Sequence, residues 1–208
     1  MDLVVCTSLR LFHLTTLLYS TAFSSADSVW YVSVATEDQV ILFGSQDYCG
    51  YKASNLIISG KLGCIFRGFQ YQIPDGYFGF AVPNDINMNL SKVVVTNVVA
   101  FALVLISGLH HAYTIRYSNR KNPAPDKEKL YSLAMVHVIS VAVCFIFTWV
   151  AFIAQAAVIG HSLSQSNNLI TDGGVAVYWG QSAFLVLGSA VIHFGWGYEA
   201  VRWRTALM

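Results

Sequence analysis

Cysteine is the first side chain in this sequence whose spacing suggests chemistry. The chain has 208 residues and four cysteines, of which Cys49 and Cys64 share one polar segment, while Cys6 and Cys144 lie in apolar segments away from it. A disulfide that closes a loop of about 15 residues stabilises a fold by about 3 kcal/mol. We therefore predict a Cys49–Cys64 disulfide in an oxidising compartment. Two free thiols, or a metal ion held by two cysteines alone, are the weaker alternatives.

Histidine is the second residue type whose positions suggest chemistry. Five of the six histidines fall within apolar segments, at similar distances from what we infer to be the same end of each segment: His13, His110, His111, His137 and His193. Ionisable groups at membrane depth are functional candidates. The simplest interpretation is neutral rings that hydrogen-bond between helices or extend toward the lipid headgroups. A pH-responsive cluster and haem or metal ligation are the alternatives.

No other constellation suggests catalysis. The sequence contains no HExxH motif and no Ser-His-Asp order, and we expect its carboxylates to be confined to loops. The formal net charge of +1, without a basic stripe, gives no indication of a nucleic-acid partner. The sequence therefore predicts a protein that is not an enzyme and holds no cofactor.

The elements that carry these residues are apolar helices. Hydrophobic residues make up 55% of the chain and charged residues only 11%, against about 25% charged residues in soluble domains. Segments of about 20 apolar residues can cross a bilayer. We predict four spans in a single domain, at 8–26, 93–115, 131–157 and 175–198. The first could instead be a cleaved signal, since Arg10 precedes its apolar core and small residues occupy 24–26.

Basic residues orient these spans. Lys and Arg crowd the short loop 116–130 and follow the fourth span, which indicates the cytoplasmic side. Both termini are then cytoplasmic, the loops 27–92 and 158–174 are extracellular, and the plasma membrane is the expected location. The polar stretch 160–168 is expected to be irregular.

Strand-like alternation is concentrated in the loop 27–92. Apolar or aromatic runs occur at 30–34, 40–43 and 62–69, and turn residues occur at 37–38, 59–61 and 74–76. We predict an antiparallel sheet of three to four strands. The predicted fold is an all-α four-helix transmembrane bundle with a disulfide-stapled extracellular sheet in its first loop.

A family resemblance agrees with this layout. Trp30, the stretch PheGlySerGlnAspTyrCys at 43–49, and Cys64 resemble the claudin superfamily pattern, and TyrTrpGlyGlnSerAlaPhe at 178–184 is similar to the start of the claudin fourth helix. The residues that carry the match besides the cysteines are Trp30, Phe43, Gly44 and Tyr48. Ser45 and Gln46 replace the Leu and Trp of claudins, and the local form is closer to fungal PalI-type, eisosomal and mating-fusion members.

The resemblance implies a function. Such proteins organise membrane domains or cell contacts through the extracellular sheet and the helix faces, in contact with the lipid bilayer and with copies of themselves or another membrane protein. The alternatives are an auxiliary subunit of a channel or of a pH or membrane sensor, and a haem-binding electron-transfer subunit that uses the histidines.

Two modification sites complete the predictions. Asn89 opens a glycosylation sequon on the expected outer side. Cys6 could be palmitoylated at the inner face of the membrane.

Overall fold

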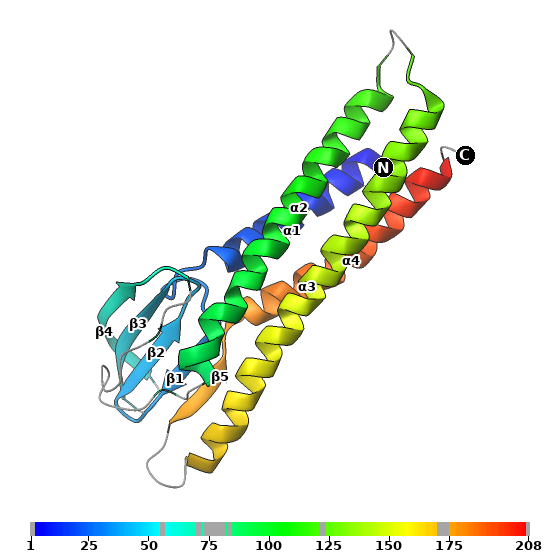
Figure 1. The fold of residues 1–208 in the computed structure, drawn as a ribbon. Helices are drawn as coiled ribbons and strands as arrows, with labels where there is room; N and C mark the ends of the chain where they lie inside the picture. The colour runs from blue at the N-terminus through cyan, green and yellow to red at the C-terminus, as the bar shows by residue number, and fades with distance from the viewer. Residues whose placement is uncertain are drawn as a thin grey trace.

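Four helices form a bundle in the computed structural model of this chain, which describes residues 3–54, 57–69, 72, 82, 85–120, 124–169 and 175–206. The helices are α1 (Leu3–Ala22), α2 (Ser91–Ser118), α3 (Lys127–Leu169) and α4 (Gln181–Ala206). α1 contacts α2 and α4, and α3 contacts the same two helices, so the four are arranged in a ring. Both chain termini and the adjoining ends of α2 and α3 lie at one end of the bundle, and a β-sheet lies at the other (Figure 1).

Within the described part of the chain, three helical segments are long and apolar enough to cross a membrane. They are Ile86–Ser118, which includes the π-helical turn η1 (Ile86–Leu90) before α2, then Lys127–Ser166 and Gln181–Ala206. This indicates a membrane protein. α1 is the fourth member of the bundle and has 20 residues, among which is the charged Arg10.

The sheet has five antiparallel strands. Four follow one another in the chain, β1 (Val32–Ala35), β2 (Gln39–Phe43), β3 (Asp47–Ser54) and β4 (Ile57–Phe66), and the fifth, β5 (Ala176–Trp179), precedes α4. The order is β4-β3-β2-β1-β5. The turn predicted at 37–38 is present, closed by a hydrogen bond from Thr36 N to Gln39 O of 2.8 Å. The disulfide prediction is also confirmed, because Cys49 and Cys64 are bonded across paired positions of β3 and β4.

Three local predictions were wrong. The residues 59–61 lie inside β4 and form no turn, because β4 pairs with β3 along its length with two register shifts. The stretch 160–168 is helical, since α3 continues to Leu169 and buries Ser162 and Ser166 on its inner face. Residues 176–179, expected within the fourth span, form β5 on the edge of β1. The turn expected at 74–76 lies outside the described residues.

Two of the three apolar clusters among the described residues hold the strands and helices together. One joins the sheet to the bundle and includes Val34, Ile41 and Phe43 of the sheet with Leu90 of η1 and Val94 of α2. The other lies further along the bundle, where Leu14 and Leu18 of α1 pack with residues of the other three helices. Strands and helices are therefore one packed unit.

A buried polar network fixes the sheet to the helices. The Tyr31 hydroxyl donates a hydrogen bond to Thr21 O of α1 (2.5 Å) and accepts one from Asn97 Nδ2 of α2 (2.5 Å). Gln155 Nε2 of α3 donates to Asn97 Oδ1 at 2.6 Å. Gly180 N at the start of α4 donates to Tyr31 O at 2.8 Å. Buried polar groups are tolerated when they are bonded in this way, and they fix a unique arrangement.

Candidate functional site

The family-motif residues lie at the base of the sheet. Phe43 ends β2 and is paired across the strands with Tyr48 of β3, with ring centroids 6.5 Å apart. Both rings are fully buried in the core shared with α2. Gly44 follows β2, and its N–H donates to Asp47 O. Trp30 O, just before β1, accepts a hydrogen bond from Ser182 N of α4 at 3.0 Å. These residues hold the sheet on the bundle and leave its outer edge free to present a surface.

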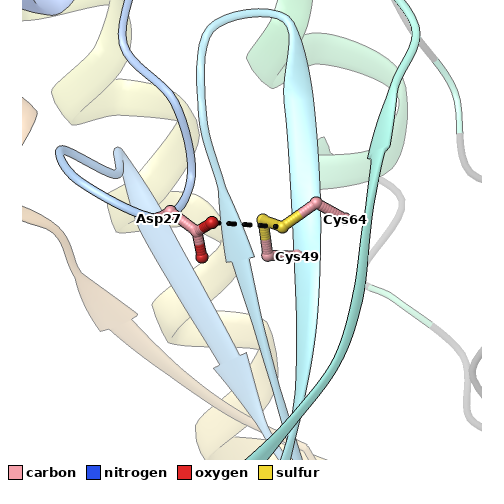
Figure 2. Close-up of side chains that lie close together, drawn as sticks. All are labelled: Asp27, Cys49 and Cys64. Carbon is pink, nitrogen blue, oxygen red and sulfur yellow. Dashed lines mark hydrogen bonds between the residues drawn. A yellow bond between two sulfur atoms is a disulfide. The ribbon is translucent and has the colours of Figure 1, made fainter.

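The disulfide lies beside a carboxylate. Asp27 Oδ2 is 3.6 Å from Cys64 Sγ (Figure 2). A disulfide sulfur has no proton to donate, so this is a close contact and not a true hydrogen bond. Ligand atoms of Asp27, Cys49 and Cys64 lie within 4.8 Å of one another. Metal ions bind cysteine as the thiolate. Cys49 and Cys64 are joined in a disulfide and offer no thiolate, so these three residues do not form a metal site.

Asp27 instead joins the end of α1 to the outer strands. Its carboxylate forms an ion pair with Lys61 of β4 and accepts a hydrogen bond from the Tyr51 hydroxyl of β3. The bonds from Lys61 and Tyr51 hold the pKa of Asp27 below its ordinary value of 3.8. Burial and the bond to Asp27 raise the pKa of Tyr51 to about 12. The side chains of Asp27 and Lys61 are both exposed. Their ion pair and the bond from Tyr51 hold the segment after α1 against β3 and β4.

A second polar group lies at the other end of the bundle, where the sequence did not predict one. The Glu199 carboxylate of α4 is 2.9 Å from Arg10 Nε of α1, and it accepts a hydrogen bond from the Thr7 hydroxyl at 3.1 Å. The expectation that carboxylates are confined to loops was wrong for Glu199, because Arg10 compensates its charge inside the bundle. Spacing could not predict this pair, since the two residues are 189 positions apart.

The guanidinium of this ion pair lies against a glycine of α4. A Cβ atom at Gly195, one turn before Glu199 on α4, would lie 1.6 Å from Arg10 Nη1. The Arg10 guanidinium therefore packs on the surface of α4 at a position that has no side chain. A Cβ at this position would make the flexible end of the Arg10 side chain shift away from α4.

Three of the five predicted histidines come together beside this pair. The rings of His111 and His137 stack with centroids 4.5 Å apart, and His110 lies 6.3 Å from His137. His193 is separate from these three but joins them through Trp196, whose ring lies 5.7 Å from His193 and 5.8 Å from His137. His13 is exposed and bonds through Nδ1 to Leu9 O of its own helix. The structure thus assembles a stacked cluster that excludes His13.

Hydrogen bonds between helices do not explain the cluster. Neither ring nitrogen of His111 or His137 has a hydrogen-bond partner among the described residues. His193 Nδ1 donates to Ser189 O on its own helix. The interhelical contacts of these rings are aromatic stacking, with Trp203 packed edge-on against both His111 and His137.

A small cavity connects the histidines to the ion pair. It has a volume of about 50 Å³ and is lined by Thr7, His111, Ile115, His137, Glu199, Ala200 and Trp203. A water molecule needs at least about 10–15 Å³, so the cavity has room for only a few. The site does not fit a haem, because the cavity is far too small and the stacked rings of His111 and His137 leave no space for a porphyrin between them. The surface of this cavity is almost entirely apolar, so it is not a polar site for water. The side chains that line it come from α1, α2, α3 and α4, and their packing joins the four helices here.

The two predicted modification sites are both half-buried. Asn89 lies in η1, is half-buried, and donates through Nδ2 to Asp85 Oδ1 at 3.2 Å. Its amide is therefore engaged in a helical turn that continues into α2. Cys6 is a free, half-buried thiol near the start of α1.

No protein-family model matches the chain, and no curated protein matches it.

Proposed function

We propose that this protein is a non-enzymatic, claudin-like tetraspan of the plasma membrane that associates with copies of itself through its sheet. In this proposal α1 is a retained fourth span, the sheet is extracellular, and both termini are cytoplasmic. The resemblance of the Trp30, 43–49 and Cys64 pattern supports the family, and the four-helix bundle with a sheet at one end agrees with it.

The observation that carries the proposal is the outer edge of the sheet. β4 is the terminal strand, and its apolar side chains face solvent, with Ile57 71% and Phe66 72% exposed and Ile58 and Leu62 about half exposed. A long edge strand with exposed apolar residues is a template for pairing with another chain. Soluble surfaces seldom keep such patches without a partner.

The rest of the sheet makes this edge rigid. The Cys49–Cys64 disulfide joins β4 to β3, and the Tyr31 network fixes β1 to all four helices. A rigid edge binds with less loss of conformational entropy than a flexible loop does. The sheet is therefore suited to present β4 to a second copy of the chain.

The test is self-association of two differently tagged copies in membranes. Ile57→Asp with Phe66→Asp places charges on β4 and should abolish co-purification of the second tag. The matched control is Tyr178→Asp, at an exposed apolar residue on the opposite edge strand β5, which should associate as the wild type does. Equal association of the β4 variant and the wild type would contradict the proposal.

An auxiliary subunit of a pH sensor is the second candidate, and the histidine cluster favours it. Protonation of one ring would place a positive charge in the stack of His110, His111 and His137, near Arg10 and Glu199. This candidate expects a larger membrane protein to co-purify with the chain at neutral pH and to be lost on acidification. In His137→Gln, that loss should disappear.

A further inference from the structure

The end of the bundle that carries both termini is strongly basic. Six cationic side chains lie at the end of α2, the start of α3 and the end of α4: Arg116, Arg120, Lys127, Lys129, Arg202 and Arg204. None of the six forms a salt bridge with a described carboxylate. Two acidic residues, Asp126 and Glu128, lie among them without pairing with them. The excess positive charge is therefore open to an external anion.

Two of these cations are held against one aromatic ring. Arg120 Cζ lies 5.6 Å and Lys129 Nζ lies 5.2 Å from the centroid of the Tyr117 ring. The hydroxyl of the same tyrosine accepts a hydrogen bond from Asp126 N at 3.2 Å, which fixes the ring between α2 and α3. Both positive charges are therefore near the same ring. Like charges repel each other, and a bound anion reduces this repulsion.

A second tyrosine positions a cation from α4. Arg204 Nη2 donates to the Tyr131 hydroxyl at 2.8 Å, and its guanidinium lies 5.4 Å from the centroid of that ring. Tyrosine rings are typical of the headgroup region at the ends of membrane spans. The cations lie at the ends of three helices able to cross a membrane. If these helices span a bilayer, the cations lie near its headgroups.

We propose that this end of the bundle binds the headgroup of an anionic phospholipid, with Arg120 and Lys129 on Tyr117 as the central phosphate contacts. Clustered Lys and Arg next to a membrane span attract anionic lipids. Arginine and lysine both bind phosphate oxygens, and arginine can do so through two parallel hydrogen bonds. The inference requires that α2, α3 and α4 cross a membrane, but it does not require the sheet to self-associate, so the two proposals fail independently.

The test is lipid binding to the delipidated protein in neutral detergent, measured by native mass spectrometry with phosphatidylserine or phosphatidylcholine. We expect phosphatidylserine to bind more tightly, and Arg120→Gln with Lys129→Gln to weaken that binding about tenfold. Lys52→Gln with Lys92→Gln removes the same charge from the sheet end and should leave binding unchanged. Size-exclusion chromatography checks that both variants fold, which is expected because all four side chains are exposed.

Three results would overturn the inference. They are equal binding of the two lipids, equal binding by the Arg120→Gln, Lys129→Gln variant and the wild type, and displacement of the lipid by glycerophosphoserine at the same concentration as phosphatidylserine. The last would show that the surface binds free anions rather than a lipid in its membrane. A loss of phosphatidylserine binding as ionic strength rises would agree with the proposal.

Discussion

At the scale of single residues, the two charged side chains of the Arg10–Glu199 ion pair differ in their exposure to solvent. The Glu199 side chain is only 7% exposed, whereas Arg10 is 44% exposed and can reach water or headgroups. Removing one member of a buried ion pair is costly because the other charge stays buried. The pair therefore depends more on Arg10 compensating Glu199 than on the reverse.

This asymmetry gives a prediction. Arg10→Gln should lower the free energy of unfolding in detergent by about 3 kcal/mol, because Glu199 is left buried without its cation. Glu199→Gln should lower it by only about 1 kcal/mol, because Arg10 can turn outward. The double variant should cost less than the sum of the two. His13→Gln, on the exposed face of α1, is the control. The opposite order of the two losses would contradict our account of the pair.

Asp27 gives a second prediction at this scale, on pH. Its pKa is lowered in the folded state by the bonds from Lys61 and Tyr51, so its contribution to stability is present above the ordinary value of 3.8 and is lost as pH falls through the lowered pKa. The melting temperature of Asp27→Asn should therefore fall less on acidification than that of the wild type. Glu37→Gln, at the exposed β1–β2 turn, should follow the wild type. Parallel curves for Asp27→Asn and the wild type would exclude this role.

At the scale of elements, the disulfide staples the edge strand. Cys49→Ser and Cys64→Ser should each lower the stability of the sheet by about 3 kcal/mol, because each change opens the same loop of 15 residues. The double variant should be little worse than either single one. Protease resistance and surface delivery of the four proteins provide the measurement. Additive losses would mean that the cysteines act separately.

The joint between the sheet and α4 is a second feature at this scale. A Cβ atom at Gly180 would lie 2.2 Å from Trp30 O, which is backbone and cannot move aside. Gly180→Ala should therefore destabilise the protein by about 1–3 kcal/mol, as overpacking does. Gly188→Ala lies within α4, where an added Cβ meets nothing within 4 Å, and should be neutral or slightly stabilising. Thermal unfolding in detergent compares the two, and equal melting temperatures would argue against a tight joint.

At the scale of the whole molecule, the fold depends on α1. Leu14 and Leu18 are fully buried among the other helices, and Arg10 compensates Glu199. The small residues at 24–26 are also engaged, because Ser45 N and Oγ both donate to Ser24 O, and Ala26 N donates to Asp47. Cleavage after α1 would break these contacts, which favours a retained helix over a cleaved signal.

The proposed topology gives a prediction for the whole chain. Both termini lie at the same end of the bundle and the sheet lies at the other (Figure 1). Epitopes added at either terminus should be labelled only after the cells are made permeable, whereas a cysteine introduced at exposed Ser59 in β4 should react with an impermeant reagent on intact cells. Labelling of a terminus on intact cells would contradict the cytoplasmic assignment.

The sequence by itself determined the features that depend on local composition. Apolar runs predicted the helices, because burial in lipid needs long stretches without charge. Alternation predicted strands between 30 and 43, and the two cysteines of one polar segment predicted the disulfide, since both signals lie within a short stretch of chain. The sequence predicted that His110, His111 and His137 lie at a similar depth in the bundle. It did not predict that their rings stack, since sequence does not show which way a ring points around a helix.

Only the tertiary structure decided the contacts between distant segments. β5 is a strand because β1 offers it an unpaired edge, and 160–168 is helical because it packs beneath the sheet. Glu199 is inside the bundle because Arg10, on another helix, crosses the surface of Gly195 to compensate its charge. A buried charge or an added strand is stable only through its partner, and no local pattern shows where that partner lies in space.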